Sequence, residues 1–301
     1  MYALQLENVV KRYGSYAAVD DVTFSIKQGS LFGLLGPNGA GKTSLIRIIT
    51  RITGADEGEI RINGNKLNQV EPRSIGYLPE ERGLYKKMKV GEQLLYLAQI
   101  KGLEKSEATD KLKSWMKKFD IEDWWGKKIQ ELSKGMQQKV QFIATVVHDP
   151  DLIILDEPFS GLDPINTNLI KDEIYSLKEK GKSVIFSTHR MEQVEEICED
   201  IVLINKGRII LEGNVTEIKN DFKENKFRFI LQSDWPSDIA KDTFDMVSNG
   251  GKEVVIKVHD GHNSNELLKE LLQRDTGIQS YNEVFPSLNE IFIKQVGESN
   301  E

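Results

Sequence analysis

The sequence predicts an α/β protein with a mostly parallel sheet and a small α+β appendage at its C-terminal end. A glycine-rich loop at residues 36–43 stands between an apolar strand and a helix. Continuous apolar runs at 152–155 and 183–187 suit central parallel strands, which are buried on both faces. After residue 220 the pattern changes to short strands and amphipathic helices, which predicts a second unit.

Composition limits the class of protein. With 301 residues, 39% of them hydrophobic and 29% charged, the chain suits one large and one small globular domain. A net charge of −7 argues against nucleic acid as the main partner, although a local basic patch is compatible with it. No apolar run is long enough to cross a bilayer, and we expect no secretion signal. Cys198 is the single cysteine, which excludes an internal disulfide and favours a reducing cytoplasm.

The first strand-like runs cover residues 4–10 and 22–26, with turn residues between them. Tyr13 lies in this turn region, upstream of the glycine-rich loop. Its ring could stack on an adenine base, and a core or turn position accounts for it equally well. Tyr16 is the second candidate for this role.

The glycine-rich loop matches the phosphate-binding pattern G-x-x-x-x-G-K-[ST], with an apolar strand at 31–35 before it and a helix after it. Glycines let backbone N–H groups approach phosphate oxygens, and the helix N-terminus adds partial positive charge. Lys42 would reach the β- and γ-phosphates, and the Thr43 hydroxyl could ligate Mg²⁺. The predicted nucleotide contacts are Gly36, Pro37, Asn38, Gly39, Ala40, Gly41, Lys42, Thr43 and Ser44.

The middle of the chain predicts a hairpin arm at 58–64, a strand at 75–78, and helices from 90 to 131. Trp124 and Trp125 are more typical of the core of a small helical subdomain than of a partner surface.

Ser133 is a natural N-cap for a helix that continues to Val146. A short Ser-x-Gly cap before a helix can form an anion site, although this signal is weak by itself.

The apolar run that begins at Leu152 ends in two carboxylates, Asp156 and Glu157. Because successive strand residues face opposite ways, the pair can serve different ligands. Asp156 suits Mg²⁺, and Glu157 suits an attacking water. Pro158 is expected to end the strand.

The apolar strand at 183–187 ends at Thr188 and His189. A lone histidine is usually structural. Ligands gather at the carboxyl ends of parallel strands, however, so His189 would face the same γ-phosphate as the acidic pair if the two strands are neighbours. Residues 201–213 predict a final hairpin that turns at 205–207.

The tail reads as a small α+β domain over residues 221–301. Strands are predicted at 226–231 and 253–258, an amphipathic helix at 264–274, and a capping box at 287–290 that opens a last helix.

The order and spacing of these motifs resemble the ATP-binding subunits of ABC transporters across roughly residues 1–220, with a helical subdomain at about 84–146. The resemblance implies a P-loop NTPase core with an antiparallel β part beside its mostly parallel sheet. It also implies that residues 36–43 are the Walker A loop and 152–157 the Walker B strand, and that 160–163 form the D-loop. Glu157, Lys42 and the switch histidine His189 would then be catalytic, and Tyr13 would stack on adenine.

Residues 132–137 resemble the LSGGQ signature of that family, with Lys134 in place of a glycine and Met136 in place of the glutamine. The resemblance implies that Ser133, Gly135 and Met136 contact nucleotide. It also implies Thr43, Glu80 and Asp156 as the ligands of Mg²⁺. Glu80 stands where the family usually carries glutamine.

The tail resembles the C-terminal extension of the sodium- and drug-export type of bacterial ABC ATPase, including the ending at 286–292. The loop at 80–85 is also similar to that group. The appended domain could be a stabilising or dimerising module, or it could be regulatory.

The resemblance implies an ATPase, with ATP and Mg²⁺ as cofactors, that powers a separate multispanning membrane permease of the export type. Two subunits, identical or paralogous, would meet head to tail with ATP between them, on the inner face of the cell membrane. One alternative is a soluble ABC-type ATPase that acts on ribosomes or DNA. That class favours two nucleotide-binding halves or a long coiled coil, whereas this sequence has one phosphate loop and no sustained heptads. A small-molecule kinase would have no use for the Ser-x-Gly cap.

Overall fold

The computed structural model describes residues 1–81, 83–236, 239, 242–274 and 276–298. The chain divides into two compact units, Met1–Val215 and Thr216–Glu301. Sequence patterns placed this boundary at residue 220. Arg82, in the loop that resembles the export-type ATPases, and residues 299–301 of the tail lie outside the described residues.

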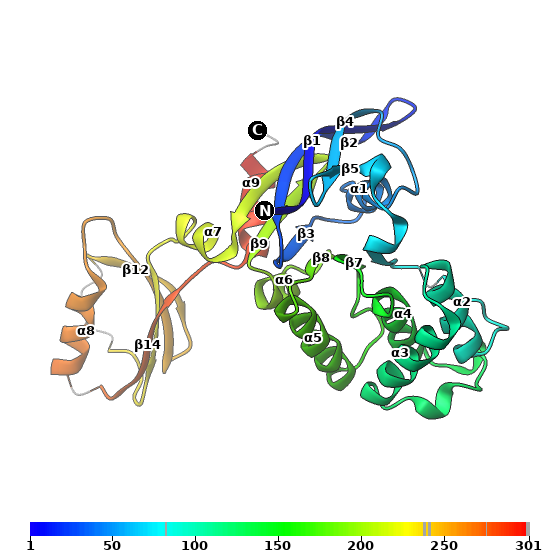
Figure 1. The fold of residues 1–301 in the computed structure, drawn as a ribbon. Helices are drawn as coiled ribbons and strands as arrows, with labels where there is room; N and C mark the ends of the chain where they lie inside the picture. Colours follow the sequence, from blue (N-terminus) through cyan, green and yellow to red (C-terminus); the bar gives the residue numbers. More distant parts are fainter. Residues whose placement is uncertain (82, 237–238, 240–241, 275, 299–301) are drawn as a thin grey trace. The chain divides into compact units, whose positions relative to one another are not determined.

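A six-stranded sheet in the first unit has the order β10-β9-β3-β8-β7-β6 (Figure 1). All neighbours pair in parallel except β10, which forms a hairpin with β9. Every residue of β3, β7 and β8 is buried, which is why these strands are the continuous apolar runs of the sequence. The bounds are β3 Leu31–Leu35, β6 Ile75–Leu78, β7 Leu152–Asp156, β8 Ser183–Thr188, β9 Asp200–Asn205 and β10 Arg208–Asn214.

An antiparallel sheet of order β2-β1-β4-β5 completes the β structure of this unit. Its strands are β1 Tyr2–Tyr13, β2 Tyr16–Lys27, β4 Glu57–Ile62 and β5 Asn65–Lys66. The runs predicted at 4–10 and 22–26 are therefore parts of one long hairpin. Tyr13 pairs with Tyr16 where the hairpin turns, which places both rings at its tip.

Helix α1, Lys42–Ile49, contributes to the core that joins these two sheets. Leu45, Ile46, Ile48 and Ile49 are at most 1% exposed and belong to one cluster with side chains from both sheets. Because α1 is fixed by this packing, its N-terminus is held at the carboxyl end of β3. The loop between β3 and α1 is the phosphate loop.

Helices α2 Val90–Ile100, α3 Lys105–Lys118 and α4 Lys134–Val146 group together after β6 (Figure 1). Trp115 of α3 and Phe119, the residue that follows α3, pack on Phe142 of α4, with ring centroids 6.4 and 5.8 Å away. The other helices of this unit are α5 Pro164–Glu179 and α6 Met191–Ile197. Short 3-10 turns occur at Leu67–Gln69, Pro72–Ser74, Glu122–Trp124 and Ile129–Glu131. No helix among the described residues is both long and apolar enough to cross a membrane.

The second unit is an antiparallel sheet of order β12-β13-β11-β14 with α8 packed on one face. Leu267 and Leu271 of α8 join the cluster around Phe229. Its elements are α7 Val215–Asp221, β11 Lys226–Leu231, β12 Phe244–Asn249, β13 Glu253–Val258, α8 Ser264–Gln273, β14 Ile278–Val284 and α9 Leu288–Glu298. Strands β11 and β13 and the two later helices were predicted. Helix α7 was not predicted. The edge strands β12 and β14 were not predicted either, because their sequences are largely polar.

Candidate nucleotide site

The phosphate loop keeps a backbone path that only glycine allows at two of its positions. Gly36 has φ +149° and Gly41 has φ +113°. A Cβ on Gly36 would lie 2.2 Å from the carbonyl oxygen of Ile204, and a Cβ on Gly41 would lie 2.2 Å from that of Ala18. The loop therefore rests directly on β9 and β2, and these contacts fix its curvature.

Lys42, the first residue of α1, is almost entirely buried at 8% exposure. Its ammonium donates hydrogen bonds to the carbonyls of Gly36 at 2.6 Å and Pro37 at 3.1 Å. Burial lowers the pKa of Lys42, and the carboxylates of Asp156, Glu157 and Glu80 act in the opposite direction. The cation is thus held inside the loop at the position where phosphate oxygens could replace the carbonyl acceptors.

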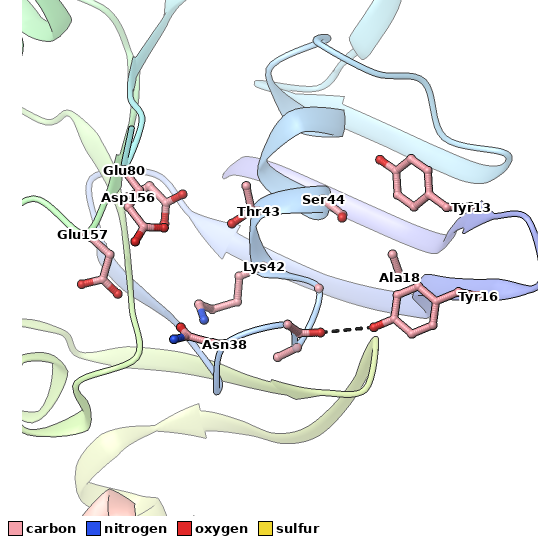
Figure 2. Close-up of a pocket in the computed structure, with 13 residues that line it drawn as sticks. Tyr13, Tyr16, Ala18, Asn38, Lys42, Thr43, Ser44, Glu80, Asp156 and Glu157 are labelled. Atoms are coloured by element: carbon pink, nitrogen blue, oxygen red, sulfur yellow. Dashed lines mark hydrogen bonds between the residues drawn. The ribbon is translucent and has the colours of Figure 1, made fainter. Parts of the chain in front are cut away.

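A pocket of about 400 Å³ opens over this loop (Figure 2). Carboxylates of Glu80, Asp156 and Glu157 stand at one end of it, and the rings of Tyr13 and Tyr16 stand at the other. The structure therefore brings together most of the residues predicted from the sequence. The lining consists of Tyr13, Tyr16, Ala18, Asn38, Gly39, Ala40, Gly41, Lys42, Thr43, Ser44, Glu80, Asp156 and Glu157.

The two tyrosines have different surroundings, although both are about half exposed. The Tyr16 hydroxyl donates to the carbonyl of Gly39 at 3.2 Å, which ties that ring to the phosphate loop. The ammonium of Lys11 lies 5.6 Å from the centre of the Tyr13 ring. A cation on one face of Tyr13 leaves the opposite face as the surface on which a base could stack.

Asp156 ends β7 and is only 2% exposed. Its Oδ1 accepts a hydrogen bond from the Ser187 hydroxyl at 2.8 Å, and its Oδ2 is buried without a partner among the described residues. Burial raises the pKa of Asp156 to about 6, and the charges of Glu80 and Glu157 add to this rise. An unpartnered buried carboxylate oxygen in the same pocket as the Thr43 hydroxyl fits the oxygen donors that Mg²⁺ prefers.

The position of Glu157 differs from the sequence-based prediction, which treated Asp156 and Glu157 as successive residues of one strand. Strand β7 ends at Asp156, so Glu157 lies beyond the strand, in a left-handed backbone conformation with φ +51°. The two carboxylates diverge because of this turn, and strand alternation is not the cause. Positive φ is uncommon for a residue other than glycine, and functional sites are where such strain is often found.

His189 is brought to Glu157 by the parallel pairing of β7 and β8. Its Nδ1 lies 2.6 Å from Glu157 Oε1, and its backbone N–H donates to the same oxygen at 2.8 Å. The Thr188 hydroxyl donates to Oε2 at 3.0 Å. Both carboxylate oxygens are therefore held, and His189 contacts Glu157 without being part of the lining of the pocket.

A second pocket, of about 620 Å³, lies at the start of α4. Ser133 caps the helix by accepting a hydrogen bond from the N–H of Met136 at 3.2 Å, as predicted. A Cβ on Gly135 would lie 3.1 Å from the carbonyl oxygen of Gly161. This signature pocket shares no residue with the pocket of Lys42, so the structure does not bring the two sets of predicted nucleotide contacts together. Its lining is Trp124, Ser133, Lys134, Gly135, Met136, Lys139, Gly161, Leu162, Asp163 and Asn166.

Several residues of these sites had not been singled out as site residues from the sequence. Ser187 and Thr188 hold the acidic pair, and Trp124 and Lys139 line the signature pocket, where the Lys139 ammonium lies 5.9 Å from the Trp124 ring centre. The hydroxyls of Ser187 and Thr188 become recognisable only when strand order is known.

Two family descriptions match the chain. Residues 19–160 match the family described as ABC transporter, and residues 213–296 match the C-terminal domain of DrrA1-3-like ATP-binding proteins.

The curated relatives include an uncharacterized ABC transporter ATP-binding protein, YhaQ of Bacillus subtilis, which is 44% identical over 98% of both chains. The linearmycin resistance ATP-binding protein LnrL of B. subtilis is 35% identical over 71% of this chain and 70% of that protein. A solved ATP-binding subunit of an ABC transporter superposes with a TM-score of 0.68 at 31% identity, covering 73% of this chain and 93% of that one. A dimeric post-hydrolysis ATP-binding cassette, MJ0796 with ADP and Pi bound, gives 0.65 at 25% identity, covering 70% and 98%.

Proposed function

The chain belongs to the ATP-binding proteins of ABC transporters and is an ATPase of that family; from this premise we propose that it energises a separate membrane-spanning exporter through ATP-driven, head-to-tail dimerisation. ATP held by Lys42 of one subunit would be closed over by Ser133, Gly135 and Met136 of the other. The separation of the two pockets within one chain supports this proposal most directly. A second subunit gives the signature pocket a nucleotide to bind.

The proposed roles in the first pocket follow from charge and position. Lys42 and the N–H groups of the phosphate loop would bind the β- and γ-phosphates, and Tyr13 would stack on adenine. Glu157 would polarise the attacking water, and His189 would hold the Glu157 carboxylate and reach the γ-phosphate. The short contact between the Glu157 and His189 side chains supports a shared role in the reaction.

Mg²⁺ would be held by Thr43, Asp156 and Glu80, and when bound it supplies positive charge that offsets the developing charge on the phosphates. The unpartnered Oδ2 of Asp156 supports this assignment. Glu80 is an exposed side chain whose role differs from that of the usual glutamine, because it brings a negative charge next to the triphosphate.

The export role is supported by relatives that are described as a linearmycin resistance protein and a Nod factor export protein. It is also supported by the DrrA1-3-like C-terminal domain. In this role the chain would sit on the inner face of the cell membrane, bound to a multispanning permease that carries the substrate site.

The test is size-exclusion chromatography of Glu157→Gln with and without Mg-ATP. This substitution keeps the size of the side chain and removes the charge that polarises water. We expect a variant that binds ATP, hardly hydrolyses it and elutes as a dimer only when ATP is present, because a ligand that binds the dimer best stabilises it by mass action.

Adding Ser133→Arg provides the matched control. The arginine would place bulk and charge in the signature pocket, which shares no residue with the pocket of Lys42. The double variant should bind ATP with unchanged affinity and stay monomeric. A Glu157→Gln protein that binds ATP and remains a monomer, even in the presence of its membrane partner, would rule out the two-site arrangement.

A further inference from the structure

Charge is distributed unevenly along this acidic chain. Residues 84–146 contain thirteen lysines and eight carboxylates, a net charge of +5, whereas the whole chain carries −7. The excess is concentrated in two short segments, 86–89 and 127–128, which contain five exposed lysines. We refer to Lys86, Lys87, Lys89, Lys127 and Lys128 as the basic patch.

Backbone pairing brings the two segments of the basic patch together. Lys89 and Lys128 form an antiparallel bridge. The N–H of Val90 donates to the carbonyl of Lys127 at 2.9 Å, and the N–H of Gln130 donates to the carbonyl of Lys86 at 3.0 Å. These hydrogen bonds fix side by side two lysine segments that lie about forty residues apart in the sequence.

Two acidic residues follow the lysine segments closely in the sequence, but their carboxylates do not pair with the lysine ammonium groups. Glu92 accepts from the backbone N–H of Lys89 at 3.3 Å, and Glu131 accepts from that of Lys128 at 2.9 Å, each as part of a capping box. Within the described part of the chain, no ammonium group of the basic patch has an ion-pair partner. The patch therefore presents five positive charges to solvent.

Exposed aromatic rings adjoin the basic patch. Tyr85 directly precedes Lys86 and is 55% exposed, and Tyr96 of α2 is 46% exposed. Their ring centres lie 6.4 Å apart in an edge-to-face arrangement. Tyrosine combines an apolar ring with a polar hydroxyl, which suits the boundary between lipid headgroups and water.

We propose that the basic patch binds the anionic headgroups of the lipid bilayer next to which this subunit works. Several long, flexible lysines without fixed partners suit a diffuse negative surface, because such a surface attracts each ammonium without requiring a defined geometry. A tyrosine pair at the edge would add contacts at headgroup level. The proposal relies on the proposed function only for placing a membrane nearby, since lipid binding by the patch needs neither ATP nor the exporter.

The test is co-sedimentation of the full chain, without nucleotide, with vesicles of phosphatidylcholine alone or mixed with phosphatidylglycerol. The wild-type chain should bind the mixed vesicles and not the neutral ones, and binding should weaken as salt is added. Lys86→Gln/Lys87→Gln/Lys89→Gln should weaken binding by about tenfold to a hundredfold, given the contribution of each lysine near an anionic surface.

The matched control is Lys105→Gln/Lys113→Gln/Lys117→Gln, which removes the same charge from exposed positions on α3. This control should bind vesicles as the wild-type chain does. If both triple variants lost vesicle binding equally, net charge alone would account for the binding and the proposal would be overturned. Equal binding of the wild-type chain to neutral and mixed vesicles would also overturn it.

Absence of vesicle binding by the wild-type chain would also overturn the proposal. If the basic-patch variant then co-purified less with the membrane exporter, the patch would be assigned to an acidic protein segment instead. ATP binding is measured on the same samples, and both triple variants should keep it because none of these lysines lines the nucleotide pocket. Failure of the wild-type chain to bind ATP would contradict the proposed function, but it would not affect the conclusion about lipid binding.

Discussion

At the scale of single residues, hydrogen bonds within the chain already hold the charged side chains of the site. The Lys42 ammonium is bonded to carbonyls of its own loop, and the Glu157 carboxylate is bonded to Thr188 and His189. Binding a triphosphate would therefore replace the carbonyl acceptors of Lys42, and only the difference between the two sets of hydrogen bonds contributes to affinity. The bonds of Glu157 to Thr188 and His189 would stay in place. The aromatic contact is different, because the base would stack on a partly exposed ring.

Tyr13→Ala should weaken ATP binding by about 1–3 kcal/mol, the range typical of base stacking on an aromatic side chain. Tyr13→Trp should retain the affinity, because it keeps a flat ring at the same place. Isothermal titration with ATP measures both. Tyr16→Phe removes only the hydrogen bond to Gly39 and serves as the control for disturbance of the loop. Unchanged affinity in Tyr13→Ala would transfer the stacking role to Tyr16 or to no aromatic residue.

His148 should make the chain less stable below neutral pH. Burial, together with the smaller effect of the nearby Lys101 charge, lowers the pKa of His148 to about 4, whereas an unfolded chain has a value near 6.5. The unfolded state therefore binds the proton more tightly, and stability is lost as pH falls from about 6.5 toward 4. Between pH 7 and pH 5 this group should remove about 2 kcal/mol from the free energy of unfolding.

Urea unfolding of the wild-type chain and His148→Leu at pH 7 and pH 5 measures this effect. The leucine variant should lose about 2 kcal/mol less between the two pH values, because its side chain does not titrate. Equal losses in the two proteins would mean that other groups account for the acid sensitivity.

At the scale of elements, the phosphate loop shows how tertiary contacts select glycine. Gly41→Ala combines φ +113° with a Cβ only 2.2 Å from the backbone of β2, so the loop or the strand must move. We expect a loss of more than about 3 kcal/mol in stability or a large loss of ATP binding.

Gly39→Ala is the matched variant in the same loop. Gly39 has φ +80°, and a Cβ there meets nothing within 4 Å. Only the backbone strain remains, so the expected cost is about 1 kcal/mol. Thermal unfolding and ATP titration of both variants separate steric contact from strain, and similar losses in the two would contradict the steric explanation.

At the scale of the whole molecule, each of the two units has its own core. Phe229 of β11 is fully buried among Trp235 and Tyr281, with ring centres 5.7 and 4.9 Å away. Phe229→Ala should therefore destabilise the C-terminal unit by about 3–5 kcal/mol. ATP affinity should not change, because every residue that lines the nucleotide pocket belongs to the first unit.

Val247→Ala, at a half-exposed position of β12, is the control and should cost well under 1 kcal/mol. Calorimetry with and without ATP provides both readings. A weaker ATP affinity in Phe229→Ala, with Val247→Ala unaffected, would show that the C-terminal unit is coupled to nucleotide binding and would support a regulatory role for it.

Features that depend on neighbouring residues could be predicted from the sequence alone. The phosphate loop, the Ser133 cap and the capping box that joins Ser287 to Glu290 are each confined to eight residues or fewer. The geometry of the two caps follows from local backbone preferences and hydrogen bonds. The phosphate loop is recognisable from its residue pattern and spacing, although contacts with β2 and β9 fix its curvature. The buried parallel strands were equally visible, because burial on both faces requires an unbroken apolar run.

The remaining features depend on which distant segments become neighbours, and only the tertiary structure decided them. The register of β7 against β8 places Ser187 opposite Asp156, and the left-handed turn at Glu157 directs its carboxylate to His189. The polar edge strands β12 and β14 form because each pairs with an apolar strand of the same sheet. Likewise, the two lysine segments of the basic patch meet only through backbone hydrogen bonds. Such pairings are set by long-range packing, about which the residues of one segment carry little information.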